Sequence, residues 1–168
     1  MMQLLTNDQT ITVGLGEICV TNDPAASLAC FGLGSCIGLC AYDPVSKVAG
    51  MAHIVLPESN HSSQSNASAK YADIAVPLLL EKMRQHGAVK SRLVTKLVGG
   101  AQMIQVAGFD SVLEMGVRNL EMTKKALAGE GIRLSAADTG GSQGRSVWLS
   151  TDSGRVTVRT AGTELKEL

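Results

Sequence analysis

The chain has 168 residues, and 15 lysine and arginine side chains balance 15 aspartate and glutamate side chains, giving a formal net charge of zero at pH 7. This balance argues against partners held by bulk charge, such as nucleic acid, and aromatic residues, at 3%, are too few to form a base-stacking platform. Hydrophobic residues make up 45% of the chain, which excludes a disordered protein, and the length predicts one domain over residues 1–168.

The first ten residues, MMQLLTNDQT, lack the basic and apolar regions of a signal peptide. Apolar runs elsewhere fall short of the roughly 20 residues that cross a bilayer. We therefore expect a cytoplasmic protein without direct membrane insertion, whose four cysteines are reduced thiols. None of the cysteines forms a C-x-x-C pair, which argues against a zinc site, with a mixed cysteine and histidine site as the alternative. The thiol chemistry considered below needs no metal or organic cofactor.

Short apolar runs bounded by glycine, proline and aspartate predict strands along most of the chain. In chain order, the expected strands cover 10–20 (with a glycine bend), 28–33, 36–42, 47–56, 92–98, 132–137, 147–150 and 155–160. Apolar residues at helical spacing predict helices over 70–86 and 113–129. Pro77 lacks an N–H, so the first helix is expected to start or kink there.

Two stretches are expected to lie outside these elements. Residues 58–69 are small and polar and predict a flexible loop, and residues 161–168 predict a loose tail. Two helices are too few to connect every pair of strands in a doubly wound sheet. The pattern instead predicts an α/β (α+β) fold, a layered sandwich of short mixed strands with two main helices.

A candidate site lies in the segment CFGLGSC, residues 30–36, followed seventeen residues later by His53. A thiol becomes a good nucleophile when a neighbour takes its proton, and imidazole is suited to that role because its usual pKa lies near neutrality. We expect a strand pair to bring Cys36 and His53 together. The turn at Gly34 and Ser35 would leave backbone N–H groups unpaired, as an oxyanion hole requires. The alternative is a small buried cysteine and a core histidine with no catalytic role.

Motifs in order along most of the chain resemble the CheD family of chemoreceptor glutamine deamidases. The residues that carry the resemblance are GLGSC (32–36), YD (42–43), AHIVLP (52–57), KYAD (70–73), VPLL (76–79), GGA (99–101), GVRN (116–119), DTGG (138–141) and GR (144–145).

The resemblance implies a hydrolase that converts particular glutamines on the cytoplasmic helices of chemoreceptors to glutamate and ammonia, in chemotaxis adaptation. It implies that Cys36 is the nucleophile, acting through a thioester intermediate, and that His53 is the base. It also suggests a CheC-type phosphatase as a partner. A regulatory binding module that docks such a phosphatase, with little or no catalysis, is the alternative function.

The chain departs from the family pattern at Cys30, where the third catalytic member, a threonine, is expected. A thiol is a weaker hydrogen-bond acceptor than a hydroxyl and would hold the imidazole less firmly. Cys30 could suffice with lower turnover, a backbone carbonyl or Ser27 could take over the role, or the activity could be reduced; we favour the first two together. A disulfide between Cys30 and Cys36 that silences the nucleophile is a further alternative.

Overall fold

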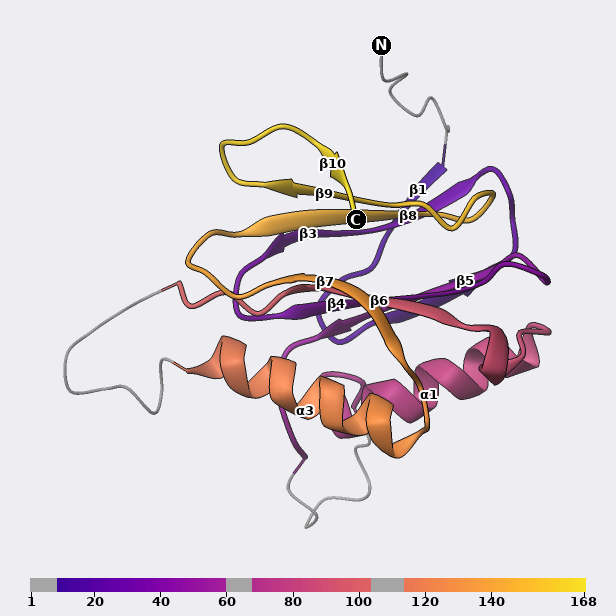
Figure 1. The fold of residues 1–168 in the computed structure, drawn as a ribbon, viewed down its shortest axis with the longest axis horizontal. Helices are drawn as coiled ribbons and strands as arrows, with labels where there is room; N and C mark the ends of the chain where they lie inside the picture. The colour runs from indigo at the N-terminus through magenta and orange to yellow at the C-terminus, as the bar shows by residue number, and fades with distance from the viewer. Residues whose placement is uncertain (1–8, 60–67, 104–113) are drawn as a thin grey trace.

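The structure is a computed structural model that describes residues 9–59, 68–103 and 114–168. Within these residues, two β-sheets are stacked face to face, and two α-helices cover the free face of one sheet (Figure 1). We call the sheet next to the helices the central sheet and the other the outer sheet. The predicted α/β sandwich of short mixed strands with two main helices is confirmed.

The outer sheet has the strand order β1-β3-β8-β9-β10. Its strands are β1 (Gln9–Thr12), β3 (Ala26–Leu33), β8 (Arg145–Ser150), β9 (Val156–Thr160) and β10 (Lys166–Glu167). Strands β8 and β9 form the expected antiparallel hairpin, whereas β1 pairs with β3 in parallel.

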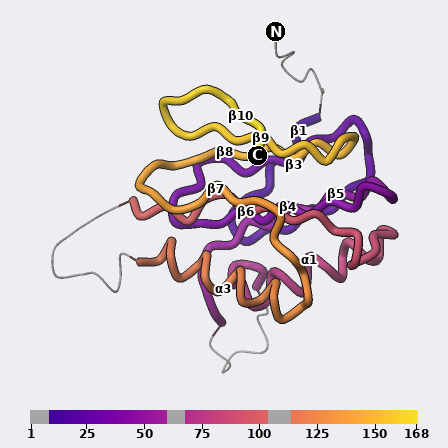
Figure 2. The backbone as a smooth tube through the Cα atoms, in the orientation of Figure 1, coloured from indigo at the N-terminus to yellow at the C-terminus, as the bar shows by residue number. Residues whose placement is uncertain are grey.

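The central sheet has the order β2-β5-β4-β6-β7. Its strands are β2 (Ile18–Thr21), β4 (Ile37–Asp43), β5 (Val48–Ile54), β6 (Val94–Gly99) and β7 (Leu134–Thr139). Strands β4 and β5 form the second expected hairpin, and the tube in Figure 2 shows β4 and β6 running across the middle of the molecule. Strand β7 runs parallel to β6.

Helices α1 (Ala72–Gln85) and α3 (Met115–Gly129) lie against the central sheet, and a short 3₁₀ helix, η2 (Lys90–Arg92), precedes β6. Helix α1 begins five residues before Pro77, so a start at that proline is wrong. Leucine, isoleucine, valine, methionine and alanine side chains fill the layer between helices and sheet. Burying this aliphatic surface supplies the main stabilisation, at about 25 cal/mol per Å².

The space between the two sheets holds a second aliphatic cluster, which we call the intersheet core. Its buried members are Val13, Leu28, Cys30, Leu33, Cys40, Tyr42, Ala49, Met51, Val98, Val147, Leu149, Val156 and Val158. Cys36 packs against one side of this cluster. The Cys36 side chain therefore belongs to the layer between the two sheets.

The strand expected over residues 10–20 is wrong in one respect, because the segment is divided between the two sheets as β1 and β2. A turn separates the two parts: the Glu17 carboxylate accepts a hydrogen bond from the amide of Gly14 at 2.7 Å, and Gly16 has a φ of 72°. Glycine adopts that left-handed conformation without steric penalty. The bend thus carries the chain from the outer sheet to the central sheet.

The predicted loose tail, 161–168, is also wrong, because it ends in β10, which pairs with β9. The backbone carbonyl of Leu168 accepts a hydrogen bond from Lys96 at 2.5 Å, and Lys166 pairs with Asp138 at 2.8 Å. These two lysine contacts tie the segment to the central sheet.

Most of the predicted flexible loop over residues 58–69 lies outside the described residues. At its start, Ser59 donates two hydrogen bonds to the Asp73 carboxylate in the first turn of α1, from its amide at 3.1 Å and from its hydroxyl at 2.8 Å. In the described parts of the chain, no helix has the length and apolar character needed to cross a membrane.

Candidate active site

Strand register places Cys36 and His53 on the same face of the central sheet. His53 on β5 is paired with Gly38 on β4, and Cys36 lies two residues before Gly38. Diagonal positions of this kind lie about 7–8 Å apart in antiparallel pairs, within reach of a long side chain. Both residues face the outer sheet, since Cys36 packs on the intersheet core and the His53 ring contacts Val13 of that core.

Gly38, the cross-strand partner of His53, lies closely against the outer sheet. A Cβ at this position would come within 3.1 Å of the Leu33 side chain and 3.2 Å of the Val147 side chain. A larger residue would therefore press against these two side chains of the outer sheet. The glycine lets the outer sheet approach the N-terminal end of β4 closely, directly after Cys36.

A backbone carbonyl orients the imidazole of His53. Its Nδ1 lies 3.0 Å from the carbonyl oxygen of Val13, and because a carbonyl can only accept, Nδ1 carries the proton and donates it. In the neutral ring, Nε2 then holds the free lone pair. Nε2 is buried and has no hydrogen-bond partner among the described residues. The arrangement leaves the ring with one nitrogen able to accept a proton.

The turn at residues 34–36 has its carbonyl groups held from one side. The Gly34 carbonyl accepts from the amide of Ala101, and the Cys36 carbonyl accepts from the amide of Gly100, both at 2.8 Å. Within the described residues, neither the amide of Ser35 nor that of Cys36 donates a hydrogen bond. Two adjacent N–H groups are therefore free to stabilise a negatively charged oxygen near the Cys36 sulfur.

Burial raises the pKa of the Cys36 thiol. The side chain is nevertheless partly exposed, whereas His53 is 4% exposed. A raised pKa means that the thiol is neutral at pH 7, so attack requires a base that removes the proton during the reaction. The accessible sulfur and the shielded imidazole are suited to these two roles.

Cys30 lies deeper in the intersheet core, on β3 of the outer sheet. It is fully buried, and its thiol donates a hydrogen bond to the Met51 sulfur at 3.4 Å. Burial raises the pKa of this thiol far above its usual value. The backbone carbonyl of Val13, and neither Cys30 nor Ser27, contacts Nδ1 of His53. All four cysteines are free thiols in the structure.

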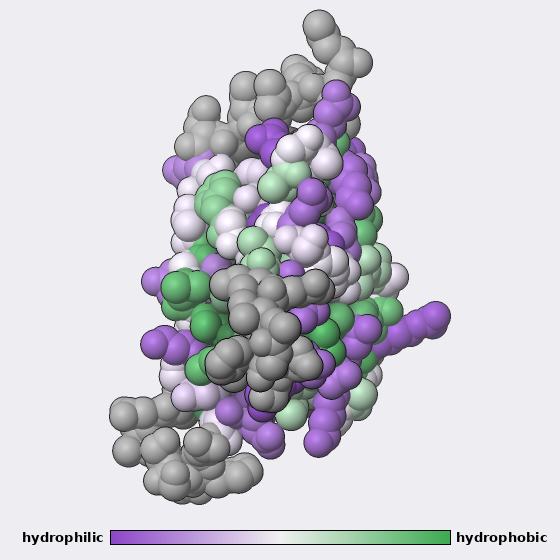
Figure 3. Space-filling view, turned by 90° about the vertical axis from the view of Figure 1, so that its left-hand side faces the viewer, coloured by the Kyte–Doolittle hydropathy of each residue, from purple (hydrophilic) through white to green (hydrophobic). Residues whose placement is uncertain are grey.

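A glycine-rich loop, residues 140–144, lies beside the same end of the sandwich, the end that Figure 3 shows. Gly140 donates to the carbonyl of Gly99 at 3.0 Å, and Gly141 accepts from the amide of Gln102 at 2.8 Å. Arg145, 9% exposed, spans the base of the loop, with hydrogen bonds to Asp138 at 3.0 Å and to the Gly140 carbonyl at 2.7 Å. The loop is thus hydrogen-bonded to residues 99–102, whose amides bind the carbonyls of Gly34 and Cys36.

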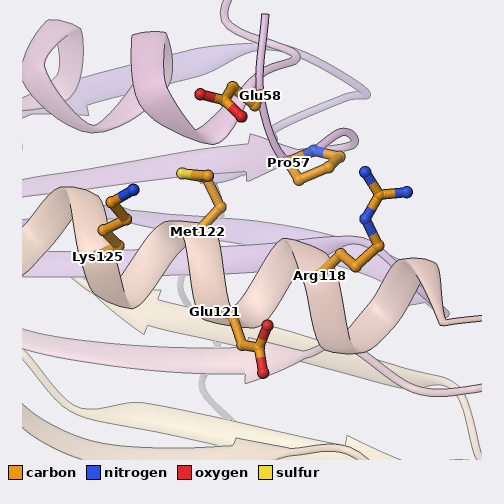
Figure 4. Close-up of a pocket in the computed structure, with 6 residues that line it drawn as sticks. All are labelled: Pro57, Glu58, Arg118, Glu121, Met122 and Lys125. Carbon is orange, nitrogen blue, oxygen red and sulfur yellow. The ribbon is translucent and has the colours of Figure 1, made fainter.

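A pocket of about 220 Å³ lies between the end of β5 and the outer side of α3 (Figure 4). It is lined by Pro57, Glu58, Arg118, Glu121, Met122 and Lys125. Charges of both signs surround it, and neither Cys36 nor His53 contributes to it. In the described residues, no three histidine, cysteine, aspartate or glutamate side chains are grouped in a way that could hold a metal ion.

Sequence reasoning missed two contributors to this region. Val13 acts through its backbone carbonyl, and nothing in its side chain could have indicated that role. Asn119 donates hydrogen bonds to the carbonyls of Ser35 and Val55, both at 2.9 Å. A signal for Asn119 did exist, because the residue ends the GVRN motif at 116–119, but the motif alone gave it no role.

Known proteins are similar to this chain over most of its length. A model of the CheD family, described as CheD chemotactic sensory transduction, matches residues 55–160. The probable chemoreceptor glutamine deamidase CheD of Clostridium novyi is 40% identical over 162 residues, 96% of this chain and 99% of that protein. The chemoreceptor glutamine deamidase CheD of Thermotoga maritima is 41% identical over 160 residues, 93% of this chain and 98% of that protein.

The family match begins after the candidate pair, whereas the alignment with the Clostridium protein leaves too little of the chain unaligned to omit Cys36 and His53. Among solved structures, the hypothetical protein YfiH of Bacillus licheniformis has a TM-score of 0.42 at 18% identity, over 80% of this chain and 59% of that one. That similarity carries no functional argument.

Proposed function

The chain belongs to the CheD family, and from this membership and the geometry of the site we propose that it is a hydrolase that deamidates glutamine side chains of chemoreceptors. Water replaces the amide nitrogen, so each turnover yields one glutamate and one ammonia. The substrate glutamines lie on the cytoplasmic helices of the receptors, which places the enzyme in the cytoplasm. The reaction uses no cofactor.

Cys36 attacks the carboxamide carbon of the substrate. As the carbon–sulfur bond forms, Nε2 of His53 takes the thiol proton, and the carbonyl oxygen gains negative charge. The free amides of Ser35 and Cys36 stabilise that oxygen. The observation that carries this assignment is the hydrogen bond between Nδ1 of His53 and the Val13 carbonyl, which leaves Nε2 as the proton acceptor.

Collapse of the tetrahedral intermediate breaks the carbon–nitrogen bond. His53 donates its extra proton to the leaving nitrogen, ammonia departs, and a γ-glutamyl thioester remains on Cys36. Water then attacks the thioester while His53 accepts a proton from it. The carbon–sulfur bond breaks, His53 returns that proton to the Cys36 sulfur, and the carboxylic acid product loses its proton to solvent as glutamate. The imidazole thus acts as base and then as acid in each half of the reaction.

A second role, docking of a CheC-type phosphatase, is compatible with the same fold and does not require the Cys36 thiol. The two functions separate experimentally, because a binding module would keep its affinity for the phosphatase when the nucleophile is removed. No contact among the described residues favours the docking role over catalysis, so deamidation is the function that we propose.

The test is conversion of glutamine to glutamate in a chemoreceptor cytoplasmic fragment, followed by mass spectrometry of its peptides and by release of ammonia. The wild-type chain should convert specific glutamines, and Cys36→Ala should lose activity by roughly 10⁴-fold or more, as expected when a nucleophile is removed. Cys19→Ala is the matched control, since Cys19 is another partly exposed thiol beside the intersheet core. Deamidation by the Cys36→Ala chain would refute the assignment of the nucleophile.

A further inference from the structure

The three backbone carbonyls of the turn at residues 34–36 all accept hydrogen bonds, but the donor to the Ser35 carbonyl differs from the other two. The carbonyls of Gly34 and Cys36 bind backbone amides of residues 100–101, whereas the Ser35 carbonyl accepts from Nδ2 of Asn119 at 2.9 Å. The turn therefore depends on one side chain, which comes from helix α3.

The same Asn119 amide group also reaches the strand that carries the base. Nδ2 donates its second hydrogen bond to the carbonyl of Val55 at 2.9 Å, two residues after His53. One NH₂ group therefore connects the backbone directly before Cys36 with the backbone directly after β5. These two chain segments carry the neighbours of Cys36 and His53.

Helix α3 can bring Asn119 to this position because Gly116 allows close approach. A Cβ on Gly116 would lie 2.5 Å from the Ala101 carbonyl oxygen and 2.6 Å from that of Gly100, contacts that real side chains do not make. The helix therefore rests directly on the segment that holds the Gly34 and Cys36 carbonyls. Asn119 itself is fully buried.

The orientation of the Asn119 amide follows from its partners. Both neighbours are carbonyl oxygens, so the NH₂ group must face them, and Oδ1 is left buried without a hydrogen-bond partner among the described residues. A buried unpaired acceptor is unfavourable. The side chain is thus held at this place for its two donors, in spite of the unpaired oxygen.

We propose that Asn119 is a positioning residue that sets the spacing of Cys36 and His53 by clamping the carbonyls of Ser35 and Val55. The proposal rests on the proposed function for the identity of the reacting groups. Asn119 touches neither sulfur nor imidazole through these bonds, so its effect passes through the backbone.

The test compares Asn119→Ala with Thr123→Val. Thr123 is equally buried one turn further along α3, and its hydroxyl bonds only to the Asn119 backbone carbonyl, at 2.7 Å. For Asn119→Ala we expect kcat on the receptor fragment to fall by about 10–10²-fold with KM nearly unchanged, because a displacement near 1 Å costs about this much. Thr123→Val should keep the wild-type kcat.

Alkylation of Cys36 by iodoacetamide provides a second measurement that needs no receptor. If Asn119 positions the pair, its loss separates the thiol from its base, so the alkylation rate near pH 7 falls and its pH profile shifts to higher pH. Asn119→Asp is the second variant, since it preserves size and its neutral carboxyl keeps one donor. Its kcat relative to wild type should fall as pH rises and the carboxyl ionises, with circular dichroism confirming the fold at each pH.

Two results would overturn the proposal: folded Asn119 variants with wild-type kcat and alkylation profile, or an equal loss in Thr123→Val, which would mean that packing alone is responsible. These outcomes are distinct from failure of the proposed function. In that case the wild-type chain itself would not deamidate the receptor, while the ratio of alkylation rates would still report whether Asn119 positions Cys36.

Discussion

The two ends of β4 carry polar groups with different chemistry. At its C-terminal end, the fully buried Asp43 carboxylate accepts hydrogen bonds from the amides of Val45 and Val89 and pairs with Arg92 at 2.7 Å. Tyr42 beside it donates to the Thr151 carbonyl at 3.0 Å and so connects the two sheets. The Asp43 carboxylate and the Tyr42 hydroxyl thus each have more than one partner.

At the N-terminal end of β4, polar groups are left unpaired among the described residues. Nε2 of His53, Oδ1 of Asn119 and the amides of Ser35 and Cys36 all lack partners there. Unpaired buried hydroxyls also occur near the other end, at Ser46 and Thr151, so the number of unpaired groups does not distinguish the two ends. The distinction lies in their chemistry, because in the described part of the chain a proton-accepting nitrogen and two adjacent N–H groups lie near a partly exposed thiol only at the N-terminal end.

The largest effect on turnover should come from removing the proposed base, His53, near the N-terminal end of β4. His53→Gln keeps a polar side chain but cannot accept and return a proton, so kcat should fall by about 10²–10⁴-fold. The stability of the chain should change little, since one hydrogen bond to the Val13 carbonyl is at stake. Turnover on a receptor fragment and urea unfolding measure the two effects. Near-wild-type turnover would exclude His53 as the base.

The opposite result is expected at the other end. Asp43→Ala leaves the Val45 and Val89 amides and the Arg92 guanidinium without their shared acceptor, and should lower the free energy of unfolding by about 3 kcal/mol, the lower end of the range for a broken buried pair. The lower end applies because the Arg92 side chain is 34% exposed. The folded variant should retain its kcat. A fall in the kcat of the folded variant would contradict the division between the two ends.

The stability contributed by Asp43 should depend on pH. Burial alone would raise the pKa of this carboxyl, but hydrogen bonds from Arg92, Val89 and Val45 outweigh burial and hold the pKa far below its usual range. Because the folded pKa lies below the unfolded value of about 3.9, the contribution is complete above that pH and is lost as the pH falls further. The free energies of unfolding of wild type and Asp43→Asn should therefore differ by a constant amount near neutrality and converge in acid. A difference that stays unchanged down to pH 2 would contradict an ionised Asp43 carboxylate in the folded protein.

A smaller effect is expected for Tyr42→Phe, which removes the hydroxyl that connects the two sheets. The free energy of unfolding should fall by about 0.5–1.5 kcal/mol, as for a typical hydrogen bond. Turnover should be unchanged, since Tyr42 lies at the end of β4 away from Cys36. Urea unfolding and a parallel activity assay measure these two quantities. An unchanged free energy of unfolding or a loss of turnover would contradict the prediction.

The smallest effect on turnover should come from Cys30→Thr, which restores the residue expected from the family. Because the Val13 carbonyl already orients His53, turnover should be equal or somewhat faster. Stability should fall by about 1–3 kcal/mol if the new hydroxyl finds no acceptor in the intersheet core. A marked loss of turnover in the folded protein would show that the Cys30 thiol has a role of its own.

The sequence predicted local structure well and long-range pairing poorly. The hairpin of β4 and β5 was readable because two apolar runs flank the Asp43-Pro44 break, and this hairpin alone brings Cys36 and His53 close. The parallel pairings of β1 with β3 and of β6 with β7 were not readable, because contacts distant in sequence determine them. The same limit explains why residues 10–20 were expected to form a single strand.

The sequence identified some residues of the candidate site and missed others for the same reason. Cys36, His53 and the glycine turn were identified because their chemistry belongs to their side chains or to a short motif. The partner of the imidazole was not identified, since a main-chain carbonyl leaves no mark in the sequence, although a backbone carbonyl was among the alternatives for the Cys30 position. Asn119 was recognised only as part of a motif, because its role depends on where α3 meets the turn.

Val13 joins the outer sheet to the imidazole: its amide donates to the Ala29 carbonyl of β3 at 2.8 Å, and its own carbonyl holds His53 on β5. The orientation of the ring is therefore coupled to the separation of the layers. A slight swelling of the sandwich would release the ring while most of the secondary structure persists. Inactivation by mild urea should accordingly precede the loss of circular dichroism, so that the enzyme stops working before it unfolds.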